Sequence, residues 1–425
     1  MQKFIKALFI FIFTLAHFFI LRNIFLLSKD MLTGDFSASH LIPSPRYEIK
    51  RVPDDAATQQ YHAKNHLAID FAQIYFPSQQ FPSLSNNYQS GVFDPLQRPS
   101  RYPPLVHFLC SITICRLDYG IASLLHMVIQ VIFFYAVFIF SFKVLKIEKD
   151  LLPGILLANC YLFLTSAGLS WFEKGQFSLY VGTAYLLLIL GIVKRNNLLV
   201  ILSALIAFVK WTSFPYIFVV FSLLILNYKN LAQLKKNILP VTAFLLIVFS
   251  LCLLFPSQSL NFLKGLYSQE RYALPGGISM AKIVPVYIAK LLPLPLILLG
   301  FINIKMIRNG FEQITPFLAG SAILMLTYPT LAYEYNLPSL LCFIPLFFHW
   351  VTLPESPIPV PLRKTMEYSF LVFLFLASFS NYLTQRAILV MGEYFVIALI
   401  LLVIPLFFYW KNISDSRRFG KRSSE

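Results

Sequence analysis

Long apolar runs recur from one end of the chain to the other, and no other feature restricts the fold so strongly. Each run approaches the length that a helix needs to cross a membrane core, roughly 17 to 25 residues. Only 13% of the 425 residues are charged, too few to cover a soluble protein of this length. The sequence therefore predicts an all-α polytopic membrane protein. The predicted spans are 4–27, 119–142, 151–169, 177–193, 238–255, 283–302, 314–331, 337–353, 366–382 and 393–410.

Positive charge predicts the topology of these spans, because cytoplasmic loops collect Lys and Arg. The net charge of +16 is divided among short clusters between apolar runs, which does not indicate a nucleic-acid partner. These clusters fall on one side only if 103–117 does not cross and 198–227 forms a broken pair of half-length helices meeting near Lys210. We then expect about twelve crossings, both termini in the cytoplasm and Lys210 at an outer apex. The clusters are at 143–149, 194–195, 229–236, 305–308, 363–364 and 411–425.

We expect one domain over 1–425, with any chemistry on its outer side. The outer segment 28–118 has room for juxtamembrane helices, whereas the inner loops are short and 411–425 is a basic cytoplasmic tail. The first span is expected to be retained, because its apolar stretch exceeds most signal peptides and no small-residue cleavage site follows. The cysteines lack metal-ligand spacing, and we interpret them as small hydrophobic residues. They are Cys110, Cys115, Cys160, Cys252 and Cys342.

Asp70 is the strongest candidate for a catalytic group. It stands in the stretch HLAIDFAQIYF (66–76), which predicts a largely apolar helix at the outer membrane surface. Partial loss of water makes a carboxylate a stronger base, which suits general base catalysis. The alternative is a structural carboxylate that begins the helix or pairs with Arg98 or Arg101.

Arg98, Arg101 and Lys210 are candidates for binding an anionic lipid headgroup at the outer boundary. A guanidinium matches a phosphate with two hydrogen bonds, and a Lys acts as a point charge. The alternative is that these side chains reach ordinary lipid phosphates without any further function.

Short polar turns between spans supply further candidates for sugar or acceptor binding. Glu173 and Gln176 lie in WFEKGQFSLY (171–180), and Glu334 lies in YPTLAYEYN (328–336). Carboxylates at a membrane boundary usually have a partner, although a polar turn and a belt of Tyr residues are also what any membrane protein needs.

Two other outer features are open to opposite interpretations. The loop predicted at 256–281 contains Gly276-Gly277 and is either a mobile lid or an idle connection. His62, His66 and His107 offer one i, i+4 pair but no clear third ligand, so we predict no metal site and no cofactor.

Four patches in this order resemble the GT-C superfamily of membrane glycosyltransferases, most closely family 87, which includes polyprenyl-phosphate-mannose-dependent α-mannosyltransferases. The long unit 174–226 is the most specific of them, because it joins a Gly-Gln turn, a span, a basic turn and an embedded Lys. The other patches are IDFAQIYF (69–76), RYPPL (101–105) and the helix pair at 328–348.

The resemblance implies a GT-C fold and an inverting transfer of mannose or another hexose from a polyprenyl-phosphate donor to a lipid or glycan acceptor. It implies that Asp70 is the base, that Lys210 with Arg98 or Arg101 binds the donor phosphate, and that Tyr102 joins the sugar-binding candidates. The protein would act at the outer face of the plasma membrane, with membrane lipids as its surroundings. A divalent metal is not obligatory, because the leaving group is already a stabilised anion.

The chain departs from that family at two places. Trp211 follows the embedded Lys, where relatives usually have Pro. Tyr333, Glu334 and Asn336 occupy the later helix pair, where relatives often carry Trp and His. The departure in the later helix pair concerns the contacts to the acceptor and the identity of the sugar.

Two other classes of function stay open. A lipid or glycan transporter or flippase also needs charged residues at broken helices, although such proteins usually show two related halves. A non-catalytic subunit of a membrane assembly is the third possibility.

Overall fold

The computed structural model describes residues 2–33, 68–79, 81, 100–228, 230–272, 276–302, 311–329, 331–354, 356–384 and 392–408. Arg98, His62, His66 and the basic tail 411–425 therefore lie outside the described residues. The chain divides into two compact units. Unit 1 comprises 1–132, 152–178 and 251–272, and unit 2 comprises 133–151, 179–250 and 273–425.

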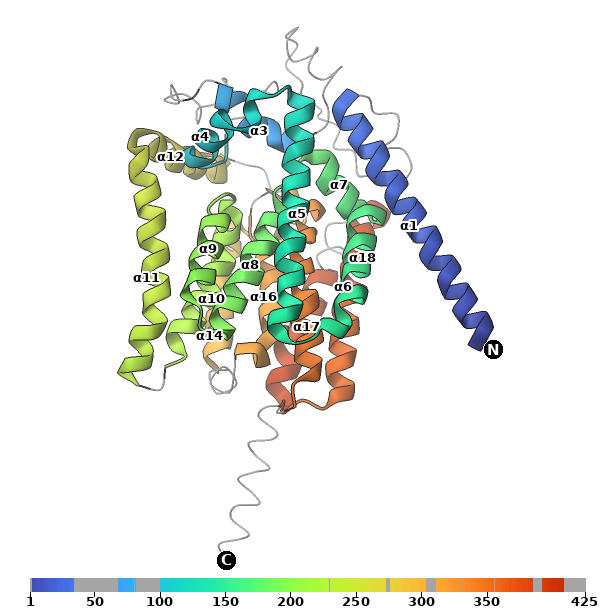
Figure 1. The fold of residues 1–425 in the computed structure, drawn as a ribbon. Helices are drawn as coiled ribbons and strands as arrows, with labels where there is room; N and C mark the ends of the chain where they lie inside the picture. The colour runs from blue at the N-terminus through green and yellow to red at the C-terminus, as the bar shows by residue number, and fades with distance from the viewer. Residues whose placement is uncertain are drawn as a thin grey trace, which may run out of the picture. The chain divides into compact units, whose positions relative to one another are not determined.

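Unit 1 is built from helices that mostly belong to the first half of the chain (Figure 1). Its elements are α1 (Gln2–Thr33), α3 (Ile69–Gln79), α4 (Pro104–Ile112), η3 (Ile114–Arg116), the first half of α5 (Tyr119–Leu145), α6 (Leu151–Leu164), α7 (Ser166–Lys174) and α12 (Pro256–Tyr272).

Unit 2 contains the remaining helices and a parallel pair of two-residue strands, β1 (Gly276–Gly277) and β2 (Leu331–Ala332). Its helices are the end of α5, η4 (Glu148–Asp150), α8 (Ser178–Val193), α9 (Asn197–Ala207), η5 (Trp211–Ser213), α10 (Phe214–Leu226), α11 (Leu231–Leu254), η6 (Met280–Lys282), α13 (Val286–Ala289), α14 (Pro293–Ile302), η7 (Phe311–Ile314), α16 (Thr315–Leu326), η8 (Glu334–Cys342), α17 (Phe343–Thr352), α18 (Val360–Thr384) and a helix at Gly392–Phe408. The prediction of a helical fold is confirmed.

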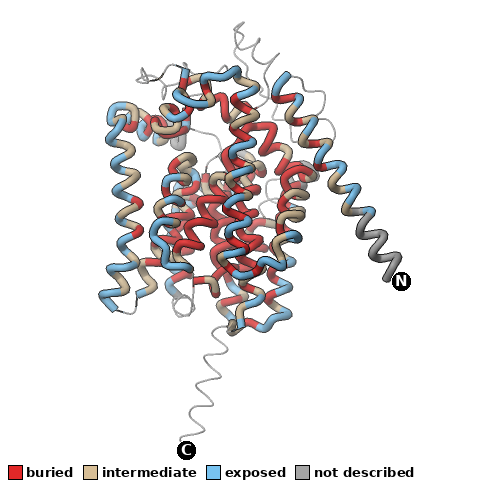
Figure 2. The backbone as a smooth tube through the Cα atoms, viewed as in Figure 1, coloured by how far each residue is buried: buried red, intermediate tan, exposed pale blue. Residues whose placement is uncertain are grey.

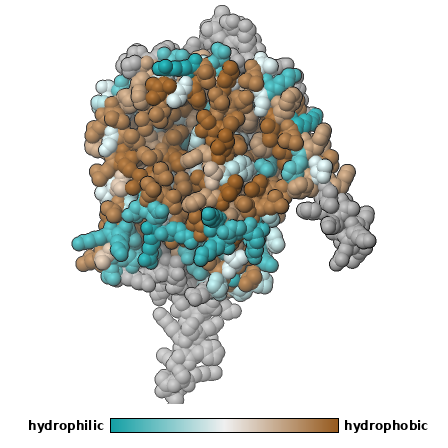
Figure 3. Space-filling view, in the orientation of Figure 1, coloured by the Kyte–Doolittle hydropathy of each residue, from teal (hydrophilic) through white to brown (hydrophobic). Residues whose placement is uncertain are grey.

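Two of the described helices, α5 and α11, are long and apolar enough to cross a membrane, or three if the bent pair α6 and α7 is one span. Six further apolar helices have 10 to 17 residues. Most apolar side chains of α11 point outward, with Leu246 58% and Phe249 61% exposed, whereas Phe244 is buried. In Figure 2 α11 is mostly exposed, and in Figure 3 most of the visible described surface is hydrophobic. These features are compatible with an integral membrane protein.

The core of unit 2 is formed by helices that bury residues around most of their circumference. Every residue of α16 is buried, and α17 buries Phe343, Ile344 and Phe347. A helix that is apolar all round belongs inside a protein or a membrane. These two helices therefore fill the interior of unit 2, while α11 presents most of its apolar side chains outward.

The interruption predicted within 198–227 is present. The helices α9 and α10 have 11 and 13 residues, and η5 with Lys210 stands between them. An α-helix of this length reaches about 17 to 20 Å, which is short of a typical membrane core. The polar break therefore lies between the end of α9 and the start of α10, two short apolar helices.

Three predicted segments differ in detail from the structure. The span at 151–169 corresponds to α6 and α7, which are bent by 68° where α7 begins with Thr165 as its N-cap. The span at 283–302 corresponds to an apolar helical segment at Val286–Phe301, in which α13 and α14 are separated by a turn before Pro293. The predicted loop at 256–281 contains the 17-residue helix α12.

The interpretation of all five cysteines as small hydrophobic residues is also wrong. Cys110 and Cys115 form a disulfide with their Cα atoms 5.0 Å apart, because α4 ends at Ile112 and the chain turns back through η3. Cys160, Cys252 and Cys342 are free. Disulfides form and persist in oxidising compartments, which agrees with the outer position predicted for 28–118.

Candidate functional site

The turn that follows α7 presents Gln176, one of the predicted site residues. Gly175 adopts a left-handed conformation with φ 65°, and its N–H donates to the Phe172 carbonyl. The Gln176 N–H donates to the Trp171 carbonyl at 3.1 Å. These two hydrogen bonds form a Schellman motif, which ends the helix sharply at a glycine. The sequence KGQ therefore fixes the direction in which the Gln176 side chain leaves the helix.

The first residues of α3 dock against this same turn. The Ala68 N–H donates to the Glu173 carbonyl at 2.6 Å, and the Tyr119 hydroxyl donates to the Ala68 carbonyl at 2.7 Å. A Cβ added at Gly175 would lie 2.8 Å from the Ala68 Cβ. Only glycine therefore allows α3 to approach so closely.

Ala68 itself has φ 54°, a conformation that costs a residue with a side chain about 1–2 kcal/mol. Such strained residues persist where the surrounding structure holds them, and they cluster at functional sites. Here the hydrogen bonds of Ala68 to Glu173 and Tyr119 hold it. The carboxylate of Asp70 lies two residues farther on, in the first turn of α3.

The half-buried carboxylate of Asp70 accepts hydrogen bonds from two amides. Gln176 Nε2 donates to Asp70 Oδ2, and Gln73 Nε2 donates to Asp70 Oδ1 at 3.3 Å. Asp70 and Gln176 are 106 residues apart in the chain and were predicted separately as site residues. The fold of unit 1 brings them together, and both interpretations of Asp70, as base and as helix-start carboxylate, agree with this position.

Two side chains of α5 form hydrogen bonds with the backbone of the turn at Gly175 and Gln176. Gln130 Nε2 donates to the Gln176 carbonyl at 2.8 Å and lies 2.9 Å from His126 Nε2. His126 is hydrogen-bonded to the Gly175 backbone, and its ring stacks on Phe71 with centroids 4.7 Å apart. Because the Gln130 amide nitrogen can only donate, His126 Nε2 is the acceptor and the proton of a neutral ring is on Nδ1.

The other predicted residues of unit 1 have different surroundings. Glu173 is buried and its Oε1 lies 3.1 Å from the Lys174 ammonium, so the carboxylate is neutralised by its neighbour. Tyr102 is buried with its ring 4.7 Å from that of Phe177. Arg101 is exposed. Tyr102 therefore packs beside the turn, whereas Arg101 faces outward.

His107 is fully buried between two serines. Its Nε2 lies 2.7 Å from the Ser100 hydroxyl, and its Nδ1 lies 3.2 Å from the Ser78 hydroxyl, which itself donates to the Ile74 carbonyl. Burial lowers the pKa of His107 to about 4, against a smaller opposite effect of a hydrogen bond to the Ile74 backbone. A neutral His107 therefore joins α4 to α3.

Unit 2 holds the two remaining predicted residues, Lys210 and Glu334. The Lys210 ammonium donates to Asn336 Oδ1 at 2.9 Å, which joins the break between α9 and α10 to η8. Glu334 is 1% exposed in the first turn of η8. Lys210 and the segment 334–336 were predicted at separate outer turns, and the structure brings them to one place.

Sequence reasoning missed the supporting residues His126 and Gln130. They stand four residues apart in an otherwise apolar helix, which places them on one helical face. Polar side chains inside a predicted span are costly and usually functional, so this pair was a usable signal.

Comparison with models of known protein families, with curated proteins and with solved structures finds no match. The class of protein therefore follows from the structure alone. It is an all-helical protein whose apolar helices are compatible with a membrane, with a carboxylate and an amide held together in one unit and a lysine at a helix break in the other.

Proposed function

We propose that this protein is a membrane glycosyltransferase of the GT-C type, which transfers mannose or another hexose from polyprenyl phosphate to a lipid or glycan acceptor. The observation that carries the proposal is the hydrogen bond from Gln176 to Asp70. It brings together the carboxylate and the amide of two patches that resemble this superfamily, and unit 1 supplies several backbone contacts to hold them.

In the proposed reaction Asp70 accepts the proton of the acceptor hydroxyl. The hydroxyl oxygen attacks the anomeric carbon, and the bond from that carbon to the phosphate oxygen breaks, so the configuration inverts. Polyprenyl phosphate leaves with the electron pair of the broken bond. Cations lower the energy of the charge that grows on it, a role for which Lys210, Arg98 and Arg101 are the candidates.

Gln176 is proposed to set the rotamer of Asp70. Its amide donates to Oδ2, and the Gln73 amide donates to Oδ1, so the two amides orient the carboxylate. Tyr102 and Glu334 are kept as candidates for sugar or acceptor contacts. The buried pair of Glu173 and Lys174 favours a structural role for Glu173.

The topology proposed with this function has about twelve crossings, both termini in the cytoplasm and the active site on the outer face of the plasma membrane. The support for it is the charge distribution, together with the disulfide between Cys110 and Cys115, which suits an oxidising outer compartment.

The test is transfer of radiolabel from a panel of polyprenyl-phosphate sugars to a membrane extract by the purified protein. We expect one donor to be used, and Asp70→Asn to lower the rate by about 10² to 10⁴-fold, the usual value of a general base. Asp118→Asn is the matched control, because Asp118 is an exposed carboxylate of the same unit. Wild-type turnover by the Asp70 variant would remove the base assignment, and the absence of any transfer would remove the proposed reaction.

A transporter or flippase is the second candidate, and the break at Lys210 is the observation that favours it. Charged residues between two half-length helices are typical of transport sites as well. In vesicles with a labelled polyprenyl-phosphate sugar, a flippase would move the label between leaflets without releasing the sugar. Transfer without such movement would exclude this candidate.

A further inference from the structure

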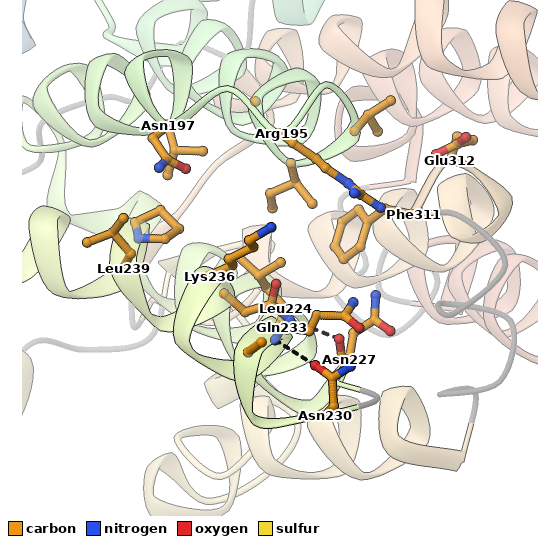
Figure 4. Close-up of a pocket in the computed structure, with 17 residues that line it drawn as sticks. Arg195, Asn197, Leu224, Asn227, Asn230, Gln233, Lys236, Leu239, Phe311 and Glu312 are labelled. Carbon is orange, nitrogen blue, oxygen red and sulfur yellow. Dashed lines mark hydrogen bonds between the residues drawn. The ribbon is translucent and has the colours of Figure 1, made fainter.

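Unit 2 contains a cavity of about 820 Å³ at the end where α8 meets α9 and where α10 meets α11 (Figure 4). Two of the loops that charge predicts to be cytoplasmic contribute to it, around 194–195 and 230–236. Its described lining includes Arg195, Asn227 and Asn230, Lys236, and Glu312 of η7. Asp70 does not line this cavity, and binding there is independent of the proposed reaction.

Two cations enter this cavity from different elements. Arg195 comes from the turn after α8, and Lys236 extends from α11 toward the ribbon that carries Arg195 in Figure 4. Within the described part of the chain, neither side chain forms an ion pair. Glu312 is the single carboxylate among the described lining residues, so that lining has two positive charges and one negative charge.

The rest of the polar lining consists of amides that hold the cavity wall in place. Asn237 Nδ2 donates to the Leu224 carbonyl at 2.7 Å and to the Asn227 carbonyl at 2.9 Å, which fixes the first turns of α11 against the end of α10. Asn230 Oδ1 caps α11 by accepting from the Gln233 N–H at 2.9 Å. Lys236 therefore stands on a helix whose first turns are held in place by hydrogen bonds.

We infer that this cavity binds a phosphate group, in the headgroup of an anionic membrane lipid or as a free phosphate. A guanidinium and an ammonium facing one space are the pair that proteins use for phosphate, the first bidentate and the second as a point charge. Leu239 and Pro240 line the same cavity from α11, and Leu239 is 57% exposed. An acyl chain fits along that apolar edge, whereas a free phosphate needs only the cations and the amides.

The experiment uses the full-length protein in phosphatidylcholine nanodiscs, with phosphatidylglycerol or inorganic phosphate as the added probe. Binding is measured by native mass spectrometry for the lipid and by the shift in thermal unfolding for both probes. The variant Arg195→Gln/Lys236→Gln should weaken binding about tenfold or more, because it removes two charge-assisted contacts. All four side chains are exposed, and the control Lys194→Gln/Lys235→Gln makes the same change in charge on neighbours that do not line the cavity, so it should retain binding.

Glu312→Gln provides a second test with the opposite sign. It removes the negative charge of the described lining and should tighten binding about threefold. This variant also covers the case in which the double cation variant does not fold.

The two probes separate the sources of the phosphate. Tight binding of phosphatidylglycerol without an effect of inorganic phosphate supports a lipid headgroup, and the reverse supports a free phosphate. Equal losses in both double variants would show a general surface charge effect and overturn the inference. So would binding that Glu312→Gln leaves unchanged, or the absence of binding by either probe.

Discussion

Asp70 and Lys210 are proposed to act on the same substrate, yet the two units hold them in different ways. Asp70 accepts from Gln176 and Gln73, and the first residues of its helix are fixed to the Glu173 and Gly175 turn. Lys210 has a four-carbon stem and donates to Asn336 of η8. The carboxylate stands on a short side chain whose helix start is fixed to a turn, whereas the ammonium stands at the end of a long and flexible side chain.

This difference matches the two chemical tasks. A general base must lie within hydrogen-bond reach of one proton, so an error of about 1 Å costs about 10²-fold in rate. A cation that stabilises a spreading phosphate charge tolerates more movement, because Coulomb energy falls only as the inverse of distance. We therefore expect unit 1 to be sensitive to small changes in backbone and side-chain length, and the break in unit 2 to be more tolerant.

The largest effect is expected for Gly175→Ala. The new Cβ would lie 2.8 Å from the Ala68 Cβ, and φ at this position is 65°. The left-handed conformation and the overpacking together cost about 3 kcal/mol. Thermal unfolding in detergent measures this loss, and transfer activity should fall with it because Gln176 is displaced from Asp70.

Gly392→Ala is the matched control, since a Cβ at Gly392 meets nothing within 4 Å. Equal stability of the two variants would show that the close approach of α3 to the turn has no energetic consequence. The contrast between the two units would then lose its structural basis.

Several helices of this protein and the break at Lys210 are predicted from the sequence, whereas the bend at Thr165 and the helix α12 are not. Apolar length locates α5, α11 and α18 because a membrane or a core imposes it. The bend at Thr165 interrupts an apolar run without any charge, so hydropathy gives no sign of it. At α12 a helix was predicted as a loop, because the many polar residues of this segment are typical of loops.

The site residues are predicted only as separate candidates. Asp70 and Gln176 are each visible as polar groups in apolar surroundings, but their hydrogen bond depends on how closely α3 approaches Gly175. The disulfide between Cys110 and Cys115 was missed for a similar reason. In a continuous helix these residues would point to different faces, and only the end of α4 brings their sulfurs together.

The second prediction compares two conservative substitutions. Asp70→Glu adds one methylene and moves the carboxylate by about 1 Å, so transfer should fall about 10²-fold. Lys210→Arg keeps the charge at the end of a long side chain, so transfer should fall only about threefold. Steady-state transfer from the labelled donor gives both numbers. If Lys210→Arg lowered the transfer rate more than Asp70→Glu, the expectation that Lys210 tolerates small changes better than Asp70 would be incorrect.

The third prediction concerns the pH dependence of unit 1. The pKa of His107 is lowered to about 4 in the folded protein, against about 6.5 in an unfolded chain. Protonation therefore favours unfolding, so the stability is complete above pH 6.5 and is lost as the pH falls toward 4. Between pH 7 and pH 5 the loss from this group is about 2 kcal/mol.

Unfolding of wild type and His107→Gln across this range measures the effect. Glutamine can retain hydrogen bonds to Ser78 and Ser100 but does not titrate. The variant should have a flatter pH profile, and parallel profiles would show that His107 is not the group responsible. His107 joins α4 to α3, the helix that carries Asp70. Transfer activity should therefore follow the pH profile of stability only at pH values where protonation of His107 weakens the packing of α3.

The smallest effect is expected for Asn336→Ala. Asn336 accepts one hydrogen bond from the Lys210 ammonium at 2.9 Å, and loss of a hydrogen bond to a charged group is worth about 1.5 kcal/mol or less at a half-buried position. Transfer should fall about threefold to tenfold in kcat/KM, because the lysine keeps its charge but loses its orientation. A double-mutant cycle decides the cause, since Asn336→Ala should have almost no further effect in a Lys210→Gln background. Additive losses would mean that Asn336 acts on the substrate by itself, and the break in unit 2 would then present two independent groups.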